Sequence, residues 1–363
     1  MKILLVGGGS GGPVSPLIAV ASDIKSNHPK AEFLLVGTAK GPEKEMAAEA
    51  RIPFTSITAG KFRRYFSFRN FLAPFEFLLG FYQSFKILKE FKPDCIFGAG
   101  SFVQVPVIWA GWFLKIPSVI HQQDVVPGLA NKLCQLAAKK ITVTFPQTLK
   151  TFSGTLGIFY KKREGDKIVL TGNPFRRELK KGSKENAIKE FQLNQSFPTL
   201  LVMGGGTGAE FLNNLVLSSL PELSKVVQVI HSTGKGKLLK EHFENYHGYE
   251  FINNMADAYA AADIVVCRAG LSTLTELSNL DKLAIIVPMP ESHQEINGML
   301  FVQTNSAIVL KQGKLKASNF VPLIRKLLFA HEAQEELKNN ISKIMPRGST
   351  EKISEIITKI AVE

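Results

Sequence analysis

The clearest chemical pattern in this chain is a run of small and hydroxyl residues that ends in a carboxylate: Arg268-Ala269-Gly270-Leu271-Ser272-Thr273-Leu274-Thr275-Glu276. An apolar strand, Ile264–Cys267, is expected directly before the run, and a helix is expected to begin after Gly270. Backbone amides at a helix N-terminus can hold phosphate oxygens. The Glu276 carboxylate, one turn further, can accept both hydroxyls of a ribose. The alternative is local, because Thr273 and Glu276 have the spacing of a capping box.

Two glycine-rich loops offer further anion sites. Gly7–Gly12 contains the GxGxxG spacing between a predicted strand and a predicted helix, and Gly204–Gly208 repeats that arrangement. A dinucleotide site also needs an acidic residue at the end of the next strand. Those strands end in Val36-Gly37-Thr38 and His231-Ser232-Thr233, which argues against a dehydrogenase. Each loop is expected either to bind phosphate or only to allow close packing of strand and helix.

The elements that place these loops are short apolar runs alternating with helix-length segments, a rhythm typical of a parallel sheet covered on both faces. The rhythm occurs twice, so the sequence predicts an α/β chain with two Rossmann-like, doubly wound domains. We expect domains over residues 1–168 and 169–345, a hinge at Leu170–Pro174, and a C-terminal helix in 346–363 that packs back on the first domain. The expected strands are Lys2–Val6, Phe33–Val36, Cys95–Phe97, Ser118–Ile120, Ile141–Thr144, Thr199–Met203, Val226–His231, Ile264–Cys267 and Ala284–Val287; the expected helices include Leu17–Asn27, Leu129–Ala138 and one from about Glu210.

The charge of the 363-residue chain is concentrated in its first half. The net charge is +13, and residues 1–167 hold 22 Lys and Arg against 11 Asp and Glu, while residues 168–363 hold 22 against 20. Such a field attracts nucleic acid, a phosphorylated ligand or an acidic membrane surface. No RNA- or DNA-binding motif is found, so nucleic acid is not expected.

Cysteine spacing and hydropathy limit the cellular compartments and site types that the sequence allows. Three distant cysteines predict neither a disulfide scaffold nor a zinc site. The chain begins with a strand rather than a signal peptide, and the longest apolar run, Val105–Leu114, is far short of the roughly 20 residues that cross a bilayer. A cytoplasmic protein without a transmembrane helix is expected.

Residues 61–91 combine nine phenylalanines with basic side chains, which is typical of peripheral binding to an anionic bilayer. The alternative is that many of these rings belong to the core. The predicted membrane patch consists of Arg63, Arg64, Arg69, Phe71, Phe75, Leu78, Phe81, Phe85, Trp112, Lys139 and Lys140.

Together, these motifs resemble the GT-B glycosyltransferases, and in particular the MurG-type enzymes of glycosyltransferase family 28. The resemblance covers almost the whole chain, through Gly8–Pro16, Gly98–Pro106, His121–Asn131, Gly172–Arg176, Gly204–Asn213, Phe251–Asp263, Arg268–Glu276 and His293–Asn297. It implies two domains that face each other across a cleft. It also implies inverting transfer of N-acetylglucosamine from UDP-GlcNAc to lipid I, the undecaprenyl-diphosphate-linked N-acetylmuramoyl-pentapeptide. The product is lipid II, a precursor of peptidoglycan. No cofactor or metal is implied, and the expected location is peripheral, at the cytoplasmic face of the plasma membrane.

The resemblance also implies roles for single residues. The Ile252 backbone would pair with uracil beside Met255, Glu276 would take the ribose hydroxyls, Arg176 would neutralise diphosphate, and Gln294 would reach the sugar. The implied donor set is Ser10, Gly11, Gly12, Asp124, Arg176, Gly206, Ile252, Met255, Leu271, Ser272, Thr273, Leu274, Thr275, Glu276, Gln294 and Asn297; the acceptor diphosphate set is Gly9, Gly11, Gly12, Gly100 and Ser101.

The departures from the family pattern are concentrated at the implied reactive cleft. Pro13 stands in place of the loop histidine, the family's HEQN reads His121-Gln122-Gln123-Asp124, and Gly206 replaces a serine. We expect Asp124 to supply the base that activates the acceptor hydroxyl, with His121 as a second candidate. Alternatively, Asp124 only hydrogen-bonds a sugar or caps the next helix.

These departures also leave other functions open for the whole chain. It is alternatively a catalytically impaired UDP-GlcNAc-binding homologue, a glycolipid glycosyltransferase, or a UDP-sugar epimerase of the same fold.

Overall fold

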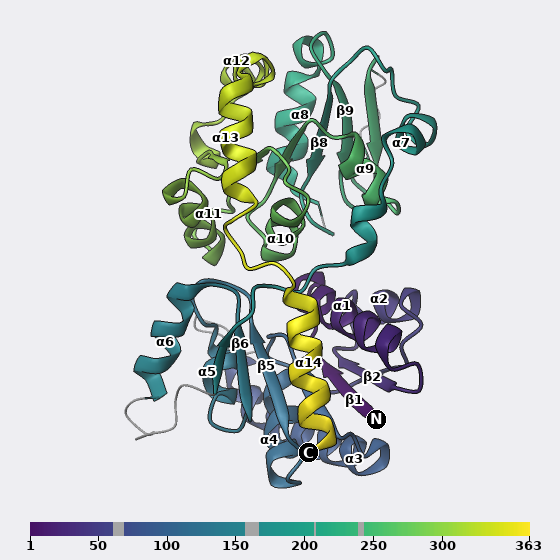
Figure 1. Ribbon diagram of the computed structural model, residues 1–363, viewed down its shortest axis with the longest axis vertical. Coiled ribbons are helices and arrows are strands. Elements are labelled where there is room, and N and C mark those ends of the chain that lie inside the picture. Colours follow the sequence, from purple (N-terminus) through teal and green to yellow (C-terminus); the bar gives the residue numbers. More distant parts are fainter. Residues whose placement is uncertain (61–68, 157–166, 207, 239–242) are drawn as a thin grey trace. The chain divides into compact units, whose positions relative to one another are not determined.

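The computed structural model describes residues 1–60, 69–156, 167–206, 208–238 and 243–363, with the backbone alone for 69–74 and 153–156. The chain forms two compact units, Met1–Arg176 with Pro346–Glu363, and Arg177–Met345 (Figure 1). The chain passes from unit 1 to unit 2 after Arg176, which is later than the expected hinge at Leu170–Pro174. The segment of the expected hinge stays hydrogen-bonded to the first unit. Thr171 N donates to Val143 O at 3.0 Å, and Phe175 N donates to Thr350 Oγ1 at 2.9 Å.

Unit 1 is built on a parallel sheet with the strand order β3-β2-β1-β4-β5-β6-β7. The order reverses between β1 and β4, so the loops after these strands open at the switch point, where doubly wound sheets bind ligands. The strands are β1 (Lys2–Val6), β2 (Glu32–Gly37), β3 (Phe54–Ser56), β4 (Cys95–Gly98), β5 (Ser118–Gln122), β6 (Lys140–Val143) and β7 (Ile168–Leu170).

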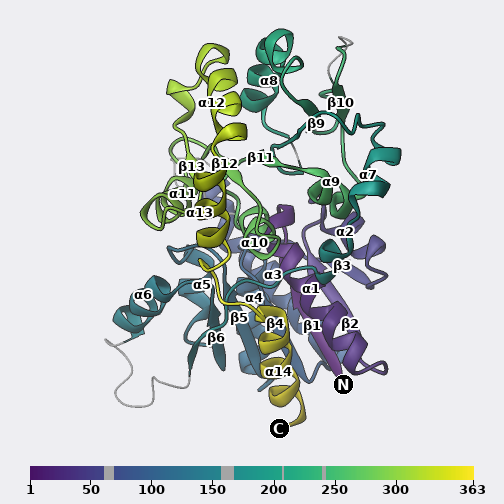
Figure 2. The same ribbon diagram turned by 45° about the horizontal axis from the view of Figure 1, so that its top comes forward.

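Helices cover both faces of this sheet. Alternate residues of β1 enter two core clusters, Leu4 and Val6 with α4 and α5, and Ile3 and Leu5 with α1 and α14. The last helix presents Ile353, Ile357 and Ile360 to the second cluster, and Figures 1 and 2 show it alongside the sheet and α1. The helices are α1 (Gly11–Asn27), α2 (Glu43–Glu49), α3 (Arg69–Phe91), α4 (Gln104–Phe113), α5 (Leu129–Cys134), α6 (Pro146–Leu156) and α14 (Ser349–Val362).

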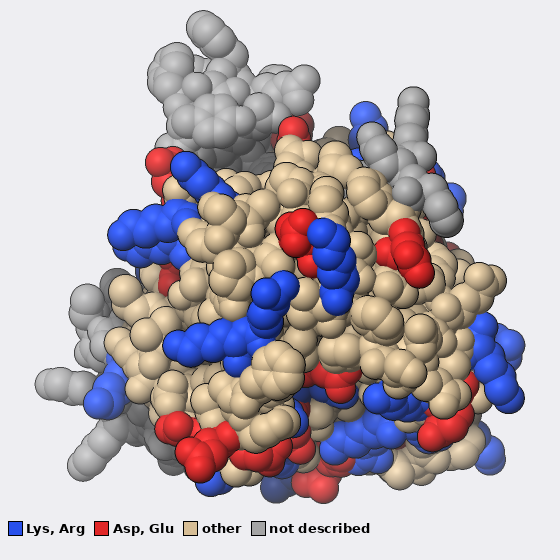
Figure 3. Space-filling model, turned by 90° about the horizontal axis from the view of Figure 1, so that it is seen from above, with Lys and Arg blue, Asp and Glu red and all other residues tan. Residues whose placement is uncertain are grey.

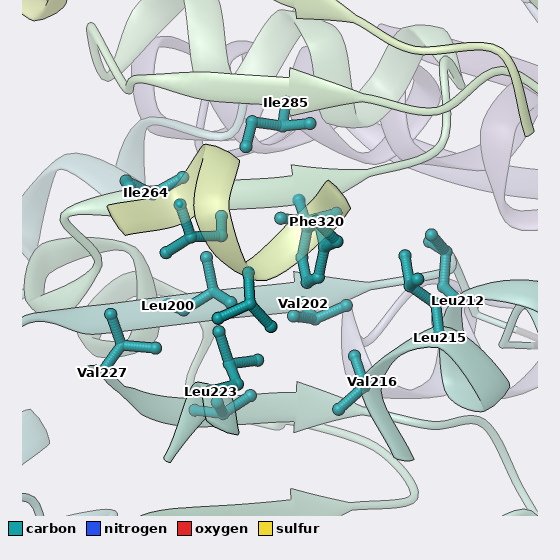
Figure 4. Close-up of a cluster of buried hydrophobic side chains, with 14 of the residues drawn as sticks. Leu200, Val202, Leu212, Leu215, Val216, Leu223, Val227, Ile264, Ile285 and Phe320 are labelled. Atoms are coloured by element: carbon teal, nitrogen blue, oxygen red, sulfur yellow. The ribbon is translucent and has the colours of Figure 1, made fainter. Parts of the chain in front are cut away.

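Unit 2 repeats the plan with the order β10-β9-β8-β11-β12-β13, again all parallel. Its core joins Leu200 and Val202 of β8 to Leu212 and Val216 of α8 and to Phe320 of α12 (Figure 4). The strands are β8 (Thr199–Met203), β9 (Gln228–Ser232), β10 (Tyr246–Tyr249), β11 (Ile264–Cys267), β12 (Ala284–Ile286) and β13 (Ile308–Val309). The helices are α7 (Lys184–Glu190), α8 (Glu210–Leu223), α9 (Met255–Ala261), α10 (Leu271–Asn279), α11 (His293–Gln303), α12 (Ala317–Phe329) and α13 (His331–Ile341), with 3₁₀ turns at Arg177–Lys181 and Gln312–Lys314.

The predicted fold class is confirmed, with local differences. The first helix begins at Gly11 rather than Leu17, because Ser10 is its N-cap and Pro13 lies in the first turn, where a missing N–H costs little. The helix expected over Leu129–Ala138 ends at Cys134 and continues as turns. In the described part of the chain, no helix combines the length and apolar character that crossing a bilayer requires.

Candidate functional site

In unit 2 the turn from β11 into α10 lies where the sequence predicts an anion site. Gly270 is the N-cap in extended conformation, and no side chain caps the helix. Leu274 N donates to Gly270 O at 3.0 Å, so the amides of residues 271–273 precede this bond at the positive end of the helix. The capping-box alternative is wrong, because Thr273 lies inside α10 and is not its N-cap.

Glu276 is held by a tyrosine that sequence reasoning missed. The Tyr259 hydroxyl of α9 donates to Glu276 Oε2 at 2.7 Å, and both side chains are buried. This bond fixes the carboxylate one turn into α10. Nothing local in the sequence pairs the two residues, since they belong to different helices. Burial, with a smaller contribution from Glu276, raises the pKa of nearby Cys267 to about 12, so this thiol stays protonated at neutral pH.

A cavity of about 620 Å³ lies beside the glycine loop of unit 2. It brings the loop after β8 and the start of α8 together with Arg268 after β11 and Gln294 of α11. The lining residues are Gly204, Gly208, Ala209, Glu210, Phe211, Asn214, Arg268, Met289, Pro290, Gln294 and Gln312.

Arg268 supplies positive charge to this cavity. Its Nη1 donates to Val287 O and Pro288 O at 3.1 and 3.2 Å, and its Nη2 donates to Gln312 Oε1 at 2.8 Å. The guanidinium also lies over the Phe211 ring, 5.9 Å from its centroid. These acceptors are neutral and hold the group without cancelling its charge. Arg268 therefore brings a positive charge and Glu210 a carboxylate to the lining, whereas residues 271–273 and Glu276 do not line this cavity.

Three predicted donor residues act through the backbone instead of lining the cavity. Leu274 and Thr275 are buried, and Thr275 Oγ1 donates to Leu271 O at 2.7 Å, so both position α10. Asn297 is also buried and donates from Nδ2 to Ala269 O at 3.3 Å, which holds the loop before α10.

The surroundings of Gln294, Ile252, Met255 and Gly206, which are also predicted donor residues, differ from one another. Gln294 Oε1 accepts from Met289 N at 3.1 Å, which leaves its Nε2 as a donor. Ile252 is buried, so it can offer only its backbone, and Met255, the first residue of α9, is half-buried. Gly206 lies in open space where a Cβ meets no atom within 4 Å, so its lack of a side chain is not imposed by packing.

In unit 1, the loop after β1 is tied to a buried carboxylate that sequence reasoning also missed. Glu43 Oε1 accepts from Gly9 N at 3.1 Å and from Thr38 N at 2.6 Å. A Cβ at Gly8, or at two further glycines (Gly37 and Gly41), would lie closer than 3.0 Å to Glu43. The expectation that the Gly9 amide binds acceptor diphosphate is therefore wrong, because Glu43 occupies that amide.

The loops after β4 and β5 are joined by a chain of buried amide side chains. Gly100 N donates to Gln104 Oε1 at 3.0 Å, Gln104 Nε2 donates to Asn131 Oδ1, and Asn131 Nδ2 donates to Gln122 Oε1 at 2.6 Å. The Gly100 amide is thus also occupied and is not an anion ligand, which corrects a second expectation.

The same chain ends at the candidate base. Gln122 Nε2 donates to Asp124 O at 2.8 Å and to Val126 O at 3.2 Å, and Gln123 Nε2 ties the loop to Ala99 O at 2.9 Å. These bonds fix the backbone that carries the half-buried Asp124. Gln122 must donate here, which an amide does and an ionised carboxylate cannot.

Other predicted anion ligands of unit 1 are not occupied by the contacts described for Gly9 and Gly100. Ser101 has φ +80°, and its buried Oγ has no hydrogen-bond partner in the described residues. Gly11 and Gly12 open α1 after the extended N-cap Ser10, whose side chain does not cap the helix. Arg176 is half-buried at the last position of unit 1 before the chain enters unit 2.

His121 does not serve as a base. Its Nδ1 is paired with Thr142 Oγ1 at 2.9 Å and its Nε2 with Asn173 Oδ1 at 2.8 Å, and the side chain is fully buried. Burial lowers the pKa of His121 to about 4. The second candidate for the base is therefore wrong, and Asp124 remains. No cluster of three or more His, Cys, Asp or Glu side chains suited to a metal occurs among the described residues.

The predicted membrane patch is divided between surface and core. Phe75, Leu78 and Trp112 are largely exposed, whereas Phe81 and Phe85 pack against the core and are only partly buried. Lys139 is paired with Glu363 at 2.6 Å, and Lys140 is half-buried. Phe113, beside Trp112, is also exposed, and sequence reasoning missed the exposed Leu79 and Tyr82. Arg63 and Arg64 lie outside the described residues, as do the side chains of Arg69 and Phe71.

Comparison with family models matches both units. Residues 3–143 match the glycosyltransferase family 28 N-terminal domain, and residues 199–355 match the glycosyltransferase family 28 C-terminal domain. A Clostridium botulinum (strain Kyoto / Type A2) protein named UDP-N-acetylglucosamine--N-acetylmuramyl-(pentapeptide) pyrophosphoryl-undecaprenol N-acetylglucosamine transferase is 35% identical over 366 residues, with 99% of each chain covered. A Legionella pneumophila (strain Paris) protein of the same name is 35% identical over 99% of this chain and 97% of its own.

Solved structures agree on the fold. The crystal structure of Acinetobacter baumannii MurG has a TM-score of 0.70 at 24% identity and covers 99% of both chains. A UDP-GlcNAc 2-epimerase from Neisseria meningitidis, bound to UDP-GlcNAc, has a TM-score of 0.68 at 15% identity and covers 99% of this chain and 100% of its own. At these identities the likeness shows the two-domain fold alone.

Proposed function

The chain belongs to glycosyltransferase family 28, and from that premise we propose that it transfers N-acetylglucosamine from UDP-GlcNAc to undecaprenyl-diphosphate-linked N-acetylmuramoyl-pentapeptide, with inversion at the sugar C1. The turn from β11 into α10 carries the proposal. It places anion-binding amides one helical turn from a carboxylate that Tyr259 holds in place. The relatives at 35% identity are named for this same transfer.

Unit 2 is the proposed donor site. The amides of residues 271–273 bind the diphosphate, Arg268 adds a positive charge, and Glu276 accepts the two ribose hydroxyls. The Ile252 backbone meets the uracil beside Met255, and Gln294 Nε2 donates to the sugar. The departing UDP gathers negative charge in the transition state, and a helix N-terminus with a guanidinium is already oriented to stabilise it.

Unit 1 is the proposed acceptor site. The amides at the start of α1, together with Ser101 Oγ, bind the acceptor diphosphate. Asp124 takes the proton from the acceptor hydroxyl as that oxygen attacks C1 and the bond to UDP breaks. Arg176 adds charge to the donor diphosphate, and Asp124 contacts the transferred sugar. The amide chain through Gln122 positions Asp124 for these contacts.

The proposed location is the cytoplasmic face of the plasma membrane, with the protein bound peripherally to anionic lipid. Support comes from the exposed Phe75, Leu78 and Trp112 of unit 1 and from the positive charge of the first half of the chain. A polyprenyl-linked acceptor is delivered from such a surface.

The test is release of UDP from UDP-GlcNAc in the presence of the lipid acceptor, with the product identified by mass. We expect turnover that requires both substrates. Tight binding of UDP-GlcNAc without turnover would identify a catalytically impaired homologue. Epimerisation of UDP-GlcNAc without acceptor would show that the protein is an epimerase and not a transferase. Transfer to another glycolipid alone would show that the acceptor is that glycolipid.

A further inference from the structure

A row of leucines follows the outward side of α5 and of the turns after it. Leu129, Leu133 and Leu136 are spaced as neighbours on one helix face and are each 44–56% exposed, as is Val126 just before the helix. The inward side of α5 carries the buried Asn131 and Cys134, so the helix is anchored and its leucines are left to solvent. These four exposed residues (Val126, Leu129, Leu133 and Leu136) are here called the α5 track.

One end of the α5 track is continuous with the aromatic surface of α3 and α4. Trp109 Nε1 donates to Leu133 O at 3.2 Å, and the Trp109 ring lies 5.7 Å from that of Trp112. The ring centroids of Trp112 and Phe113 are 5.1 Å apart, and those of Phe113 and Phe81 of α3 are 5.8 Å apart. An unbroken series of contacts therefore leads from α5 to the exposed rings.

The other end lies at the candidate base. Val126 is two residues after Asp124, and Gln122 Nε2 bonds both of their carbonyls. Thr148 Oγ1 also donates to Val125 O at 2.9 Å, so the start of the α5 track is fixed relative to Asp124. Exposed Lys132 lies between Leu129 and Leu133 in the sequence, and exposed Lys139, which is paired with Glu363, follows the far end of the α5 track.

We propose that the α5 track binds the first isoprene units of the acceptor's polyprenyl chain, between the lipid surface and Asp124. This inference rests on the proposed function. The row suits one apolar chain because it is a single line of side chains, whereas the broader aromatic surface of α3 and α4 suits the bilayer itself. The acceptor's diphosphate would lie at the loop end, among the amides, while its first isoprene units cover the leucines. Covering half-exposed leucines with hydrocarbon removes apolar surface from water, which favours binding.

The test uses the double variant Leu129→Ser/Leu133→Ser and three acceptors that differ only in the tail, which is undecaprenyl, geranyl or absent, all in detergent. We expect the KM for the undecaprenyl acceptor to rise about tenfold. We expect the KM for UDP-GlcNAc and the kcat to stay within about twofold. The KM for the geranyl acceptor should rise less than that for the undecaprenyl acceptor, because the shorter tail contacts fewer leucines. The matched control is Met299→Ser/Val302→Ser on α11 of unit 2, an exposed apolar pair that should change none of these values.

Several results overturn the proposal. The leucines do not bind the tail if the double variant leaves the KM for both prenyl acceptors unchanged. The same conclusion holds if it raises the KM equally for the undecaprenyl and the tail-free acceptor. Binding to anionic phospholipid vesicles without acceptor is measured in parallel with Phe75→Ser/Leu78→Ser. An equal loss of vesicle binding in both double variants would assign the leucines to the bilayer.

The proposed function is contradicted independently of the α5 track if the unaltered protein turns over none of the acceptors. In that event equilibrium binding of undecaprenyl diphosphate against inorganic diphosphate, which has no tail, still tests the α5 track. Tail-dependent binding that the Leu129→Ser/Leu133→Ser variant loses supports the track, and tail-independent binding overturns it.

Discussion

At the residue scale, the site depends on carboxylates whose surroundings differ. Glu276 and Glu43 are buried and held by donors from other elements, Tyr259 and the amides of Gly9 and Thr38. Asp124 is half-buried on a loop fixed through its backbone. The first two are therefore suited to holding a ligand or a loop in place, whereas Asp124 has the access that proton transfer to a substrate requires.

Removal of the Tyr259 hydroxyl tests how Glu276 is held. Hydrogen bonds to charged groups contribute about 1.5–3 kcal/mol, so Tyr259→Phe should weaken UDP-GlcNAc binding by roughly tenfold or more. Titration calorimetry measures the effect, and Tyr249→Phe in β10 is the control, because its ring lies outside this contact. Equal affinities for Tyr259→Phe and the unaltered protein would contradict an orienting role.

Asp124 is tested by an isosteric change. Asp124→Asn keeps the shape and removes the base, so kcat should fall by about 10²–10⁴-fold while the dissociation constant of UDP-GlcNAc stays the same. Retention of full transfer activity would reassign Asp124 to sugar contact or helix capping. Loss of donor binding would instead place it in the donor site.

Two buried histidines predict how stability depends on pH. Burial lowers the pKa of His121 and of His231 from 6.5 to about 4. The unfolded chain therefore binds more protons between about pH 6.5 and pH 4, and the free energy of unfolding falls as pH falls through this window. Each unit of pH in the window costs up to about 1.4 kcal/mol for each histidine.

Urea unfolding measures this dependence. Both tryptophans, Trp109 and Trp112, belong to unit 1, so their fluorescence follows the unit that contains His121. The variant His121→Asn, which does not titrate, should be less stable at neutral pH and should lose less stability on acidification. An unchanged slope would show that His121 is not the titrating group.

At the element scale, the sequence predicts what depends on local patterns and misses what depends on distant contacts. Continuous apolar runs identified the central strands, because strands buried on both faces need them. β3, β7, β10 and β13 were missed, since they lie at or near sheet edges and are short or only partly buried. The sequence predicts that the first glycine loop either binds phosphate or only allows close packing, and it does not predict that the Gly9 amide is held by Glu43, 34 residues away.

The amide chain between the β4 and β5 loops is tested at Asn131. Asn131→Ala leaves Gln104 Nε2, Gln122 Oε1 and His121 O without their bonds, which should lower the free energy of unfolding of unit 1 by about 2–4 kcal/mol. Because the loop that carries Asp124 loses its anchor, kcat should also fall while UDP-GlcNAc affinity is retained.

The control for this prediction is the buried Asn213 of unit 2, whose Oδ1 lies 3.1 Å from His231 Nε2. Asn213→Ala should lower the free energy of unfolding of unit 2 by a similar amount without lowering kcat. A stable Asn131→Ala enzyme with normal kcat would show that the amide chain has no positioning role.

At the scale of the whole molecule, charge separates the two halves of the chain. The excess of basic residues lies in residues 1–167, and the face shown in Figure 3 has acidic and basic side chains interspersed. A mixed surface produces little long-range field, whereas clustered lysines and arginines attract anionic lipid at about 1 kcal/mol for each residue near the surface. The first half is therefore expected to set the affinity for membranes.

Charge reversal tests this expectation. Arg63→Glu/Arg64→Glu/Arg69→Glu should weaken sedimentation with anionic vesicles by at least 100-fold, since three attractive contacts are lost and replaced by repulsion. Raising the ionic strength from about 0.1 M to about 1 M shortens the Debye length from about 10 Å to about 3 Å, so the unaltered protein should lose most of its binding and the variant little. The control reverses Lys181, Lys189 and Lys326, which are exposed on unit 2 and should leave binding unchanged. Equal losses in the two triple variants would mean that net charge alone sets the affinity, and that no face of the first half is specialised for lipid.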